Sequence, residues 1–174
     1  MNKLGQRISI VGCSGSGKTT LGRDLARRLQ VPAVDLDELI WLPDWQTREE
    51  TEFKTLVRRE LREEKWVISG NYSRLRPEVW ALAQTVIWLD YSFFVVMRQL
   101  LRRTFRRSLR GDLCCNGNRE TWGRVFSRDS ILLWGLRSYA KCRREYPTLL
   151  THAEYAHLQI LRFHTPRQTR DWLA

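Results

Sequence analysis

The sequence lacks any long apolar run. None of its stretches approaches the roughly 18 uncharged apolar residues that a membrane-spanning helix needs. The first residues, Met1 to Arg7, lack the apolar core of a secretory signal peptide and lead directly into a strand-like segment. We therefore expect a cytoplasmic protein that makes no contact with a membrane.

Cysteine is scarce and shows no metal-binding spacing. The four residues Cys13, Cys114, Cys115 and Cys142 form neither a CxxC pair nor a block with His, so a structural zinc site has little support. Cys114 and Cys115 are adjacent in a polar stretch, where a vicinal disulfide or a chance surface position is expected before metal ligation. With 174 residues the chain can bury a core without disulfides, and we expect one domain over residues 1–174.

Lysine is also scarce, although the chain is strongly basic. Lys and Arg number 30 against 19 acidic residues, which gives a net charge of +11, and only five of the 30 are Lys. Such a charge implies anionic partners. The planar guanidinium of Arg can grip a phosphate with two parallel hydrogen bonds. Composition leaves two partners open, the phosphates of a nucleotide or the backbone of a nucleic acid.

Short apolar runs alternate with helical patterns along the chain. Strands are predicted at Arg7–Val11, Ala33–Asp37, Trp66–Gly70, Thr85–Asp90 and His157–Phe163. Helices are predicted at Lys18–Leu29, from a capping box at Thr47–Glu50 to about Lys65, from Ser92 to about Arg107, from about Ser127 to Glu145 before Pro147, and after Thr165. This alternation predicts an α/β fold with a parallel sheet covered by helices on both faces. Ligands of such folds bind at the carboxyl ends of the strands.

A phosphate-binding loop follows the first predicted strand. Residues 12–19 match GxxxxGK[ST] between a strand and a helix, the setting that confirms this motif. Its glycines let successive N–H groups point at one phosphate, and the helix N-terminus adds a positive dipole end. Lys18 is expected to reach the β- and γ-phosphates, and the Thr19 hydroxyl to ligate Mg²⁺. The predicted nucleotide-binding residues are Gly12, Cys13, Ser14, Gly15, Ser16, Gly17, Lys18, Thr19 and Thr20.

Two carboxylates, Asp35 and Asp37, end the second predicted strand. Because side chains alternate along a strand, both are expected on the side that faces the cleft. Asp35 is predicted to hold the metal, and Asp37 to accept the proton of an attacking hydroxyl. The alternative is a helix N-cap beside a solvated neighbour.

Arginines bracket the polar stretch from Ser108 to Glu120. They are Arg98, Arg102, Arg103, Arg106, Arg107, Arg110, Arg119, Arg124 and Arg128. Two or three are expected to clamp the transferring phosphoryl group when this loop closes. The rest are interpreted as a solvated basic face.

Aromatic residues gather near the predicted strand ends. Trp41 and Tyr72 are candidates to line an acceptor site together with Asn71 and Asp37. The alternative for the aromatic rings is ordinary core packing.

Several segments together resemble one family. They are the P-loop, Leu36-Asp37, Trp66-Val67-Ile68, Gly70-Asn71-Tyr72, Gly117-Asn118-Arg119-Glu120 and Asp129 to Trp134. With these the chain resembles, from about Ile8 to Leu173, the bacterial FlaR-type DNA topology modulation proteins. Those are similar in turn to adenylate kinase and other small P-loop kinases.

The resemblance implies a three-layer P-loop NTPase fold with strand order 2-3-1-4-5 and ATP as the donor. It also implies a lid at about 108–128 and an acceptor-binding segment at about 41–64, with Arg103 and Arg119 as catalytic arginines at the lid. Ser69 departs from the pattern, because relatives usually carry an acid before Gly-Asn-Tyr.

The leading hypothesis is a kinase that moves the γ-phosphate of Mg-ATP to a small acceptor, a nucleoside, nucleotide or metabolite. The rival is a nucleotide-regulated DNA-binding protein, supported by the charge and the family label. No helix-turn-helix, zinc-finger or RNA-binding signature accompanies that charge. The third hypothesis is a protein that binds nucleotide without turning it over. The sequence does not decide between a monomer and a homodimer.

Overall fold

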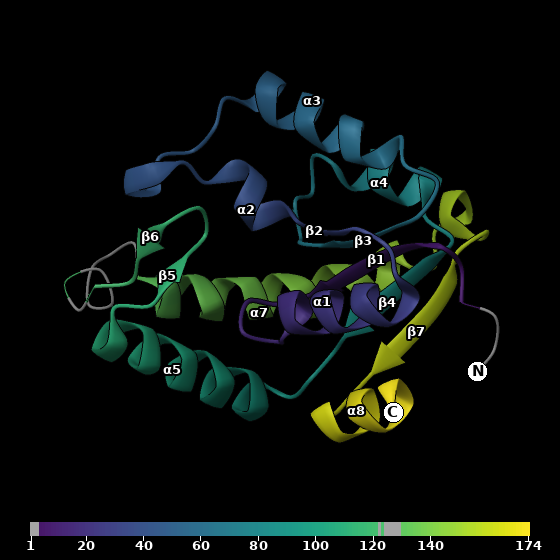
Figure 1. Cartoon of the computed structure of the whole chain (residues 1–174). Coiled ribbons are helices and arrows are strands. Elements are labelled where there is room, and N and C mark those ends of the chain that lie inside the picture. The colour runs from purple at the N-terminus through teal and green to yellow at the C-terminus, as the bar shows by residue number, and fades with distance from the viewer. Residues whose placement is uncertain (1–3, 122, 124–129) are drawn as a thin grey trace.

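Five parallel strands form the central sheet. The computed structural model describes residues 4–121, 123 and 130–174 (Figure 1). The strands are β1 (Arg7–Gly12), β2 (Ala33–Asp35), β3 (Trp66–Ser69), β4 (Thr85–Leu89) and β7 (Gln159–Phe163). They lie in the order β2-β3-β1-β4-β7, and all four neighbouring pairs are parallel. The predicted α/β fold with strand order 2-3-1-4-5 is therefore confirmed.

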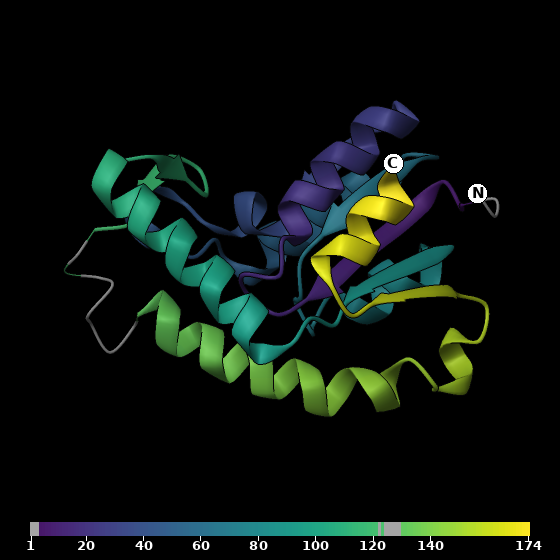
Figure 2. The same ribbon diagram turned by 90° about the horizontal axis from the view of Figure 1, so that it is seen from below.

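Helices cover both faces of this sheet. They are α1 (Lys18–Leu29), α2 (Leu36–Ile40), α3 (Glu50–Leu61), α4 (Arg76–Leu82), α5 (Phe93–Arg110), α7 (Ile131–Leu149) and α8 (Pro166–Leu173), with short 3-10 turns η1 (Pro43–Trp45) and η2 (Ala153–Tyr155). Helices α1 and α8 lie on one face, and α7 runs along the other (Figure 2). Helix α4 shares the α7 face, because the ring of Trp80 lies 6.2 Å from that of Tyr146. The arrangement has the three expected layers.

The core is built from the apolar strand runs. Ile8, Ile10 and Val11 of β1 are at most 2% exposed, since side chains on both faces of a covered parallel sheet are buried. In α1, Leu21 and Leu25 are buried and Leu29 packs against the core.

Two predicted helix ends were wrong. Helix α3 begins at Glu50 and is capped by the Glu49 carboxylate, which accepts hydrogen bonds from the next turn's N–H groups, while Thr47 forms an isolated bridge with Trp41. Helix α7 continues to Leu149 and contains Pro147. The proline lies in the last helical turn, where its missing N–H removes only one intrahelical bond. The predicted start of this helix, at about Ser127, lies outside the described residues.

A small hairpin follows α5 in the predicted lid. Its strands β5 (Leu113–Cys114) and β6 (Asn118–Arg119) pair antiparallel. The Asn118 amide group donates to Leu42 O (2.8 Å) and accepts from Trp45 N (2.7 Å). The hairpin is thus bonded to the segment that contains η1. Residues 122 and 124–128 of the predicted lid, including Arg124 and Arg128, lie outside the described residues.

A buried carboxylate joins three elements at the end of β4. Asp90 has a side chain only 1% exposed and accepts from Arg143 of α7 (2.7 Å) and Arg162 of β7 (2.6 Å). The Arg162 guanidinium also lies over the Trp88 ring, 4.2 Å from its centroid. Removal of the carboxylate leaves two guanidinium groups without their buried partner.

We predict that Asp90→Ala lowers the free energy of unfolding by about 2–3 kcal/mol, less than for a fully buried pair because both arginines are partly exposed. Urea unfolding measures this value. The control is Asp112→Ala, which removes an exposed partner of Arg106 (3.7 Å) and should cost under about 0.5 kcal/mol. Equal losses in the two variants would show that Asp90 is not a structural clamp.

Candidate functional site

The loop after β1 has the geometry of a phosphate cradle. Gly12, Gly15 and Gly17 have φ values of 149°, 86° and 93°, in the region that favours glycine. A Cβ on Gly12 would lie 2.8 Å from the carbonyl oxygen of Leu89. The loop ends at the N-terminus of α1, whose first residue is Lys18. Such a loop and helix end favour a bound anion.

Lys18 and Asn71 both bond to the loop's own backbone. The Lys18 ammonium group donates to Gly12 O (2.7 Å) and Cys13 O (3.1 Å). The Asn71 amide accepts from Gly12 N (3.2 Å) and donates to Gly12 O. Asn71 also accepts from the Tyr146 hydroxyl of α7 (3.2 Å). These contacts give Asn71 a positioning role in the loop, beside its predicted role in acceptor binding.

The acid pair follows β2, but not as two strand residues. Asp35 ends β2 and accepts from Asp37 N (3.1 Å), so it is the N-cap of α2, and Asp37 lies in that helix. The strand geometry predicted for the pair was therefore wrong, and the capping alternative describes Asp35. Both carboxylates nevertheless reach the same cleft. The short β2 gives way to a helix turn because a side-chain cap satisfies the first free N–H group.

The surroundings of Asp35 fit a magnesium ion. Burial and the negative charge of Asp37 raise the pKa of Asp35, while a hydrogen bond to the Thr19 side chain opposes that rise. A cation beside Asp35 would offset the repulsion between the two carboxylates that contributes to this rise. Carboxylate, hydroxyl and phosphate oxygens are the ligands that Mg²⁺ prefers. Thr19 and Asp35 are the residues that would hold it.

Asp37 is oriented by an aromatic neighbour. The Tyr72 hydroxyl donates to Asp37 Oδ1 (2.6 Å), and the Tyr72 ring packs edge-on against Phe53, with 5.2 Å between centroids. Burial and the charge of Asp37 raise the pKa of Tyr72, so its hydroxyl stays protonated and remains a donor. Trp41 and Trp45 form a second edge-on pair (5.5 Å) in the wall of the cleft. The Asp37 carboxylate is therefore held in a fixed orientation next to aromatic rings, where it can accept a hydrogen bond.

Of the two predicted lid arginines, the structure brings one into the cleft. Arg103 lines it, and burial together with the charge of Arg107 lowers the Arg103 pKa. Arg107 also lines it and donates to Glu120 (2.9 Å). Arg119 has an exposed side chain and is not among the cleft-lining residues of the described structure. Its backbone oxygen accepts from the Trp45 indole N–H (3.1 Å) instead.

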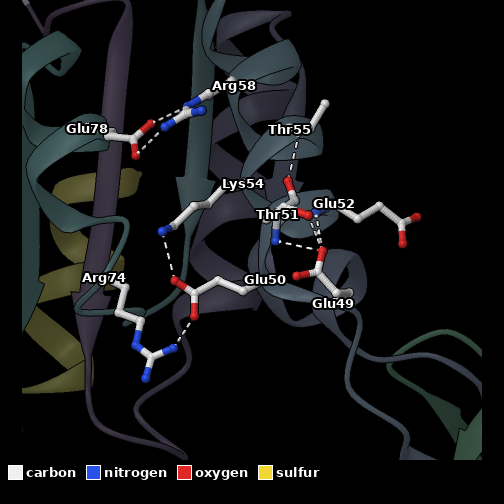
Figure 3. Close-up of polar contacts among 9 residues, drawn as sticks. All are labelled: Glu49, Glu50, Thr51, Glu52, Lys54, Thr55, Arg58, Arg74 and Glu78. Atoms are coloured by element: carbon white, nitrogen blue, oxygen red, sulfur yellow. Dashed lines mark hydrogen bonds and ion pairs between the residues drawn. The ribbon is translucent and has the colours of Figure 1, made fainter.

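Ion pairs fix the helix of the predicted acceptor segment (Figure 3). Glu50 of α3 pairs with Lys54 (2.7 Å) and with Arg74 beyond β3. Arg58 donates to both oxygens of Glu78 in α4, at 2.7 and 3.0 Å. Each exposed pair contributes little to stability. Glu50–Arg74 and Arg58–Glu78 link α3 to the segment after β3 and to α4, whereas Glu50–Lys54 lies within α3.

The P-loop, the acid pair and the two aromatic pairs line one cleft of about 2120 Å³ at the carboxyl ends of the strands. Its walls contain most of the predicted site residues, namely Ser14, Gly15, Ser16, Gly17, Lys18, Thr19, Thr20, Asp35, Asp37, Trp41, Asn71, Tyr72 and Arg103. Gly12 and Cys13, the first residues of the loop, are buried and do not line the cleft. Of the acceptor segment at 41–64, the cleft-lining residues lie between Trp41 and Lys54.

Sequence reasoning missed three contributors to this cleft. Asn118 joins the hairpin of the predicted lid to the predicted acceptor segment, and Glu120 pairs with Arg107. Ser138 of α7 accepts from Ser14 N of the P-loop (3.2 Å). The alternation of an extended segment was the available signal for the lid, because it places residues 118 and 120 on the face opposite Arg119. No local sequence pattern predicts the contact of Ser138 with the P-loop.

Comparison with known proteins identifies the family. A family model described as shikimate kinase matches residues 14–114, more than half of the chain, so the chain belongs to the shikimate kinase family. It is 31% identical over 104 residues to the YqaC protein of Bacillus subtilis, covering 59% of this chain and 58% of that one. It is 36% identical over 113 residues to a shikimate kinase of Synechococcus sp. CC9605, covering 57% and 55%. The chain thus spans little more than half the length of these relatives.

Solved structures show the same fold. A shikimate kinase from Bacteroides thetaiotaomicron has a TM-score of 0.55 at 22% identity, covering 96% of this chain and 93% of that one. A gluconokinase from Sinorhizobium meliloti has a TM-score of 0.56 at 17% identity, covering 99% and 93%. The P-loop kinase part of the predicted resemblance is confirmed, whereas its topology modulation part stays a prediction. Among the described helices, none is both long and apolar enough to cross a membrane.

The raised pKa of Asp35 predicts a pH-dependent stability effect. A carboxyl with a raised pKa in the folded state stabilises it at pH below the unfolded value of about 3.9, and this contribution is lost as pH rises through the folded value. Asn at this position keeps an oxygen for the cap but carries no charge. At pH 7 without Mg²⁺, Asp35→Asn should therefore melt a few degrees above the unchanged protein.

Thermal melts across pH check this, and the difference should disappear below about pH 4. Added Mg-ATP should stabilise the unchanged protein more than the variant. If the variant melts below the unchanged protein at pH 7 without Mg²⁺, the charged Asp35 carboxylate does not destabilise the fold, and the prediction is wrong.

Proposed function

We propose that the protein is a phosphotransferase that moves the γ-phosphate of Mg-ATP to a hydroxyl of a small acceptor. One observation carries the proposal: the P-loop, the acid pair and Arg103 line a single cleft. Phosphoryl transfer needs donor, acceptor and positive charge at one place, because positioning and electrostatics supply most of the catalysis. Membership of the shikimate kinase family supports the same activity.

The residues divide between donor and acceptor. When ATP binds, the Lys18 ammonium group breaks its hydrogen bonds to the Gly12 and Cys13 carbonyls and binds the β- and γ-phosphates. The backbone N–H groups of the loop donate to phosphate oxygens. Bound Mg²⁺, held by Thr19 and Asp35, would neutralise phosphate charge. Arg103 stabilises the charge that develops on the transferred group. Asp37 orients the acceptor hydroxyl and takes its proton.

The acceptor side favours a small polar molecule with an apolar face. Trp41, Trp45 and Phe53 supply flat apolar walls, and Asp37 supplies the hydrogen-bond acceptor for a hydroxyl. The curated relatives include shikimate kinases, and a structural neighbour is a gluconokinase. We therefore place small hydroxy acids first in an acceptor screen, followed by nucleosides and nucleotides.

DNA binding of the FlaR type is the second candidate, and the position of the charge argues against it. Arg102, Arg103, Arg106 and Arg107 of α5 and Arg137 of α7 all line the cleft. Their guanidinium groups are thus placed for a ligand inside the cleft. We further propose that residues 1–174 act as one kinase domain in the cytoplasm, as a monomer or homodimer.

Duplex DNA should bind weakly, without sequence preference and with a steep dependence on salt. Filter binding over a salt series measures this. Tight, sequence-selective binding at physiological salt would favour the DNA-binding function.

Two substitutions should separate donor from acceptor chemistry. Asp37→Asn should lower turnover on an acceptor found by the screen by about 10²–10⁴-fold, the usual contribution of a general base. Its affinity for Mg-ATP should change little, because the P-loop residues hold the donor. Lys18→Ala should weaken Mg-ATP binding itself. Calorimetry and a coupled assay of ADP release measure the two effects.

Asn has the shape of Asp and keeps an oxygen that accepts from the Tyr72 hydroxyl, so Asp37→Asn should retain the local structure of the unchanged protein. Near-normal turnover in Asp37→Asn, or a loss of ATP affinity equal to that of Lys18→Ala, would refute this division of labour.

A further inference from the structure

Two adjacent thiols line the cleft at the lid hairpin. Cys114 ends β5 and Cys115 begins the turn to β6, and both are free cysteines. Cys114 is 9% exposed, so a chance surface position is wrong for it. Their side chains are close enough to shift each other's pKa. Both face the cleft, which gives small molecules a route to them.

The two thiols differ in their surroundings. The hydrogen bond from Cys115 and the positive charge of Arg107 lower the Cys114 pKa to about 7, against the effect of burial. The hydrogen bond, burial and the negative charge of Asp37 raise the Cys115 pKa. Near neutral pH a substantial fraction of Cys114 is therefore a thiolate, beside a protonated Cys115 thiol. A thiolate next to an arginine is the reactive form of cysteine.

The turn that carries these residues is already constrained. Cys115 and Asn116 have φ values of 40° and 62°, although neither is glycine. The Asn118 side chain donates to Cys115 O (2.7 Å) and holds this conformation. Adjacent Cα atoms lie about 3.8 Å apart, closer than in ordinary disulfides. A disulfide between neighbours is therefore strained and easily reduced, as in reversible redox sites.

From this placement we propose that Cys114 and Cys115 are a reversible thiol-oxidation site of the lid, modified by low-molecular-weight disulfides such as oxidised glutathione. The Cys114 thiolate attacks one sulfur of the disulfide, the S–S bond breaks, and one glutathione thiolate leaves. The Cys115 thiol then loses its proton to solvent and attacks the Cys114 sulfur, which releases the second glutathione. Two protein thiols are oxidised, and one disulfide is reduced to two thiols.

This modification would act on the cleft through the hairpin. Oxidation removes the negative charge of Cys114 beside Arg107 and forces the Cys115 turn into a ring. That turn is bonded through Asn118 to Trp45 of the acceptor segment. A regulatory effect on phosphoryl transfer rests on the proposed function, whereas the thiol chemistry does not.

The chain contains its own comparison thiols. Cys13 is 4% exposed, and Cys142 is 8% exposed and lines the cleft as Cys114 does, so their pKa and not their access sets them apart. Burial raises the Cys13 pKa to about 11 and also raises that of Cys142. These two should therefore remain reduced under conditions that oxidise the lid pair.

The test is incubation of the full chain with oxidised glutathione at pH 7, followed by alkylation and mass spectrometry. We expect a Cys114–Cys115 disulfide that forms at least about tenfold faster than any modification of Cys13 or Cys142. Dithiothreitol should reverse it. The Trp45 amide, bonded to Asn118, should exchange its hydrogen faster after oxidation.

Single substitutions test the roles of the two sulfurs. Cys115→Ser should stop at a stable mixed disulfide on Cys114, and Cys114→Ser should leave Cys115 unmodified over the same time. Cys142→Ser, the matched control, should oxidise like the unchanged chain. Equal rates at all four cysteines, equal reactivity of the two lid variants, or a mixed disulfide that persists in the unchanged chain would overturn the proposal. These results do not depend on whether an acceptor is found.

Discussion

The hydrogen bonds between the Asn71 amide and both backbone groups of Gly12 hold the rest of the site in register. Gly12 is the point where β1 becomes the P-loop, and Asn71 follows the neighbouring strand β3. Tyr146 of α7 bonds to the same amide. One side chain therefore fixes the phosphate loop relative to the acceptor side and to the helix behind it. This junction links the P-loop to Asn71 and Tyr72, which we propose for acceptor binding.

The lid side depends on a second amide, that of Asn118. Its bonds to Leu42 and Trp45 hold the hairpin against the predicted acceptor segment, beside the cleft that Arg103 and Arg107 of α5 line. Cys114 and Cys115 lie in the same hairpin, so their oxidation should alter the contact of the hairpin with the predicted acceptor segment.

The sheet and P-loop could be predicted from sequence because both rest on local signals, a buried apolar run and a glycine motif. The alternation of side chains along a strand does not place Asp37 correctly, because Asp37 is not in a strand. The side chain of Asp35 caps a helix that begins at Leu36. Arg119 was predicted at the cleft from the resemblance. Its outward position depends on hairpin pairing, which brings Asn118 and Glu120 inward, and on contacts 73 residues away in sequence.

The central claim is that the cleft transfers phosphate to an acceptor and does not merely bind or hydrolyse ATP. The most direct measurement is a ³¹P NMR time course of Mg-ATP with the protein and pools of small hydroxy acids, nucleosides and nucleotides. The account predicts that a phosphate ester signal of the acceptor grows at the rate at which ADP appears. ATP that stays intact, or that yields only ADP and inorganic phosphate with every pool, would contradict it.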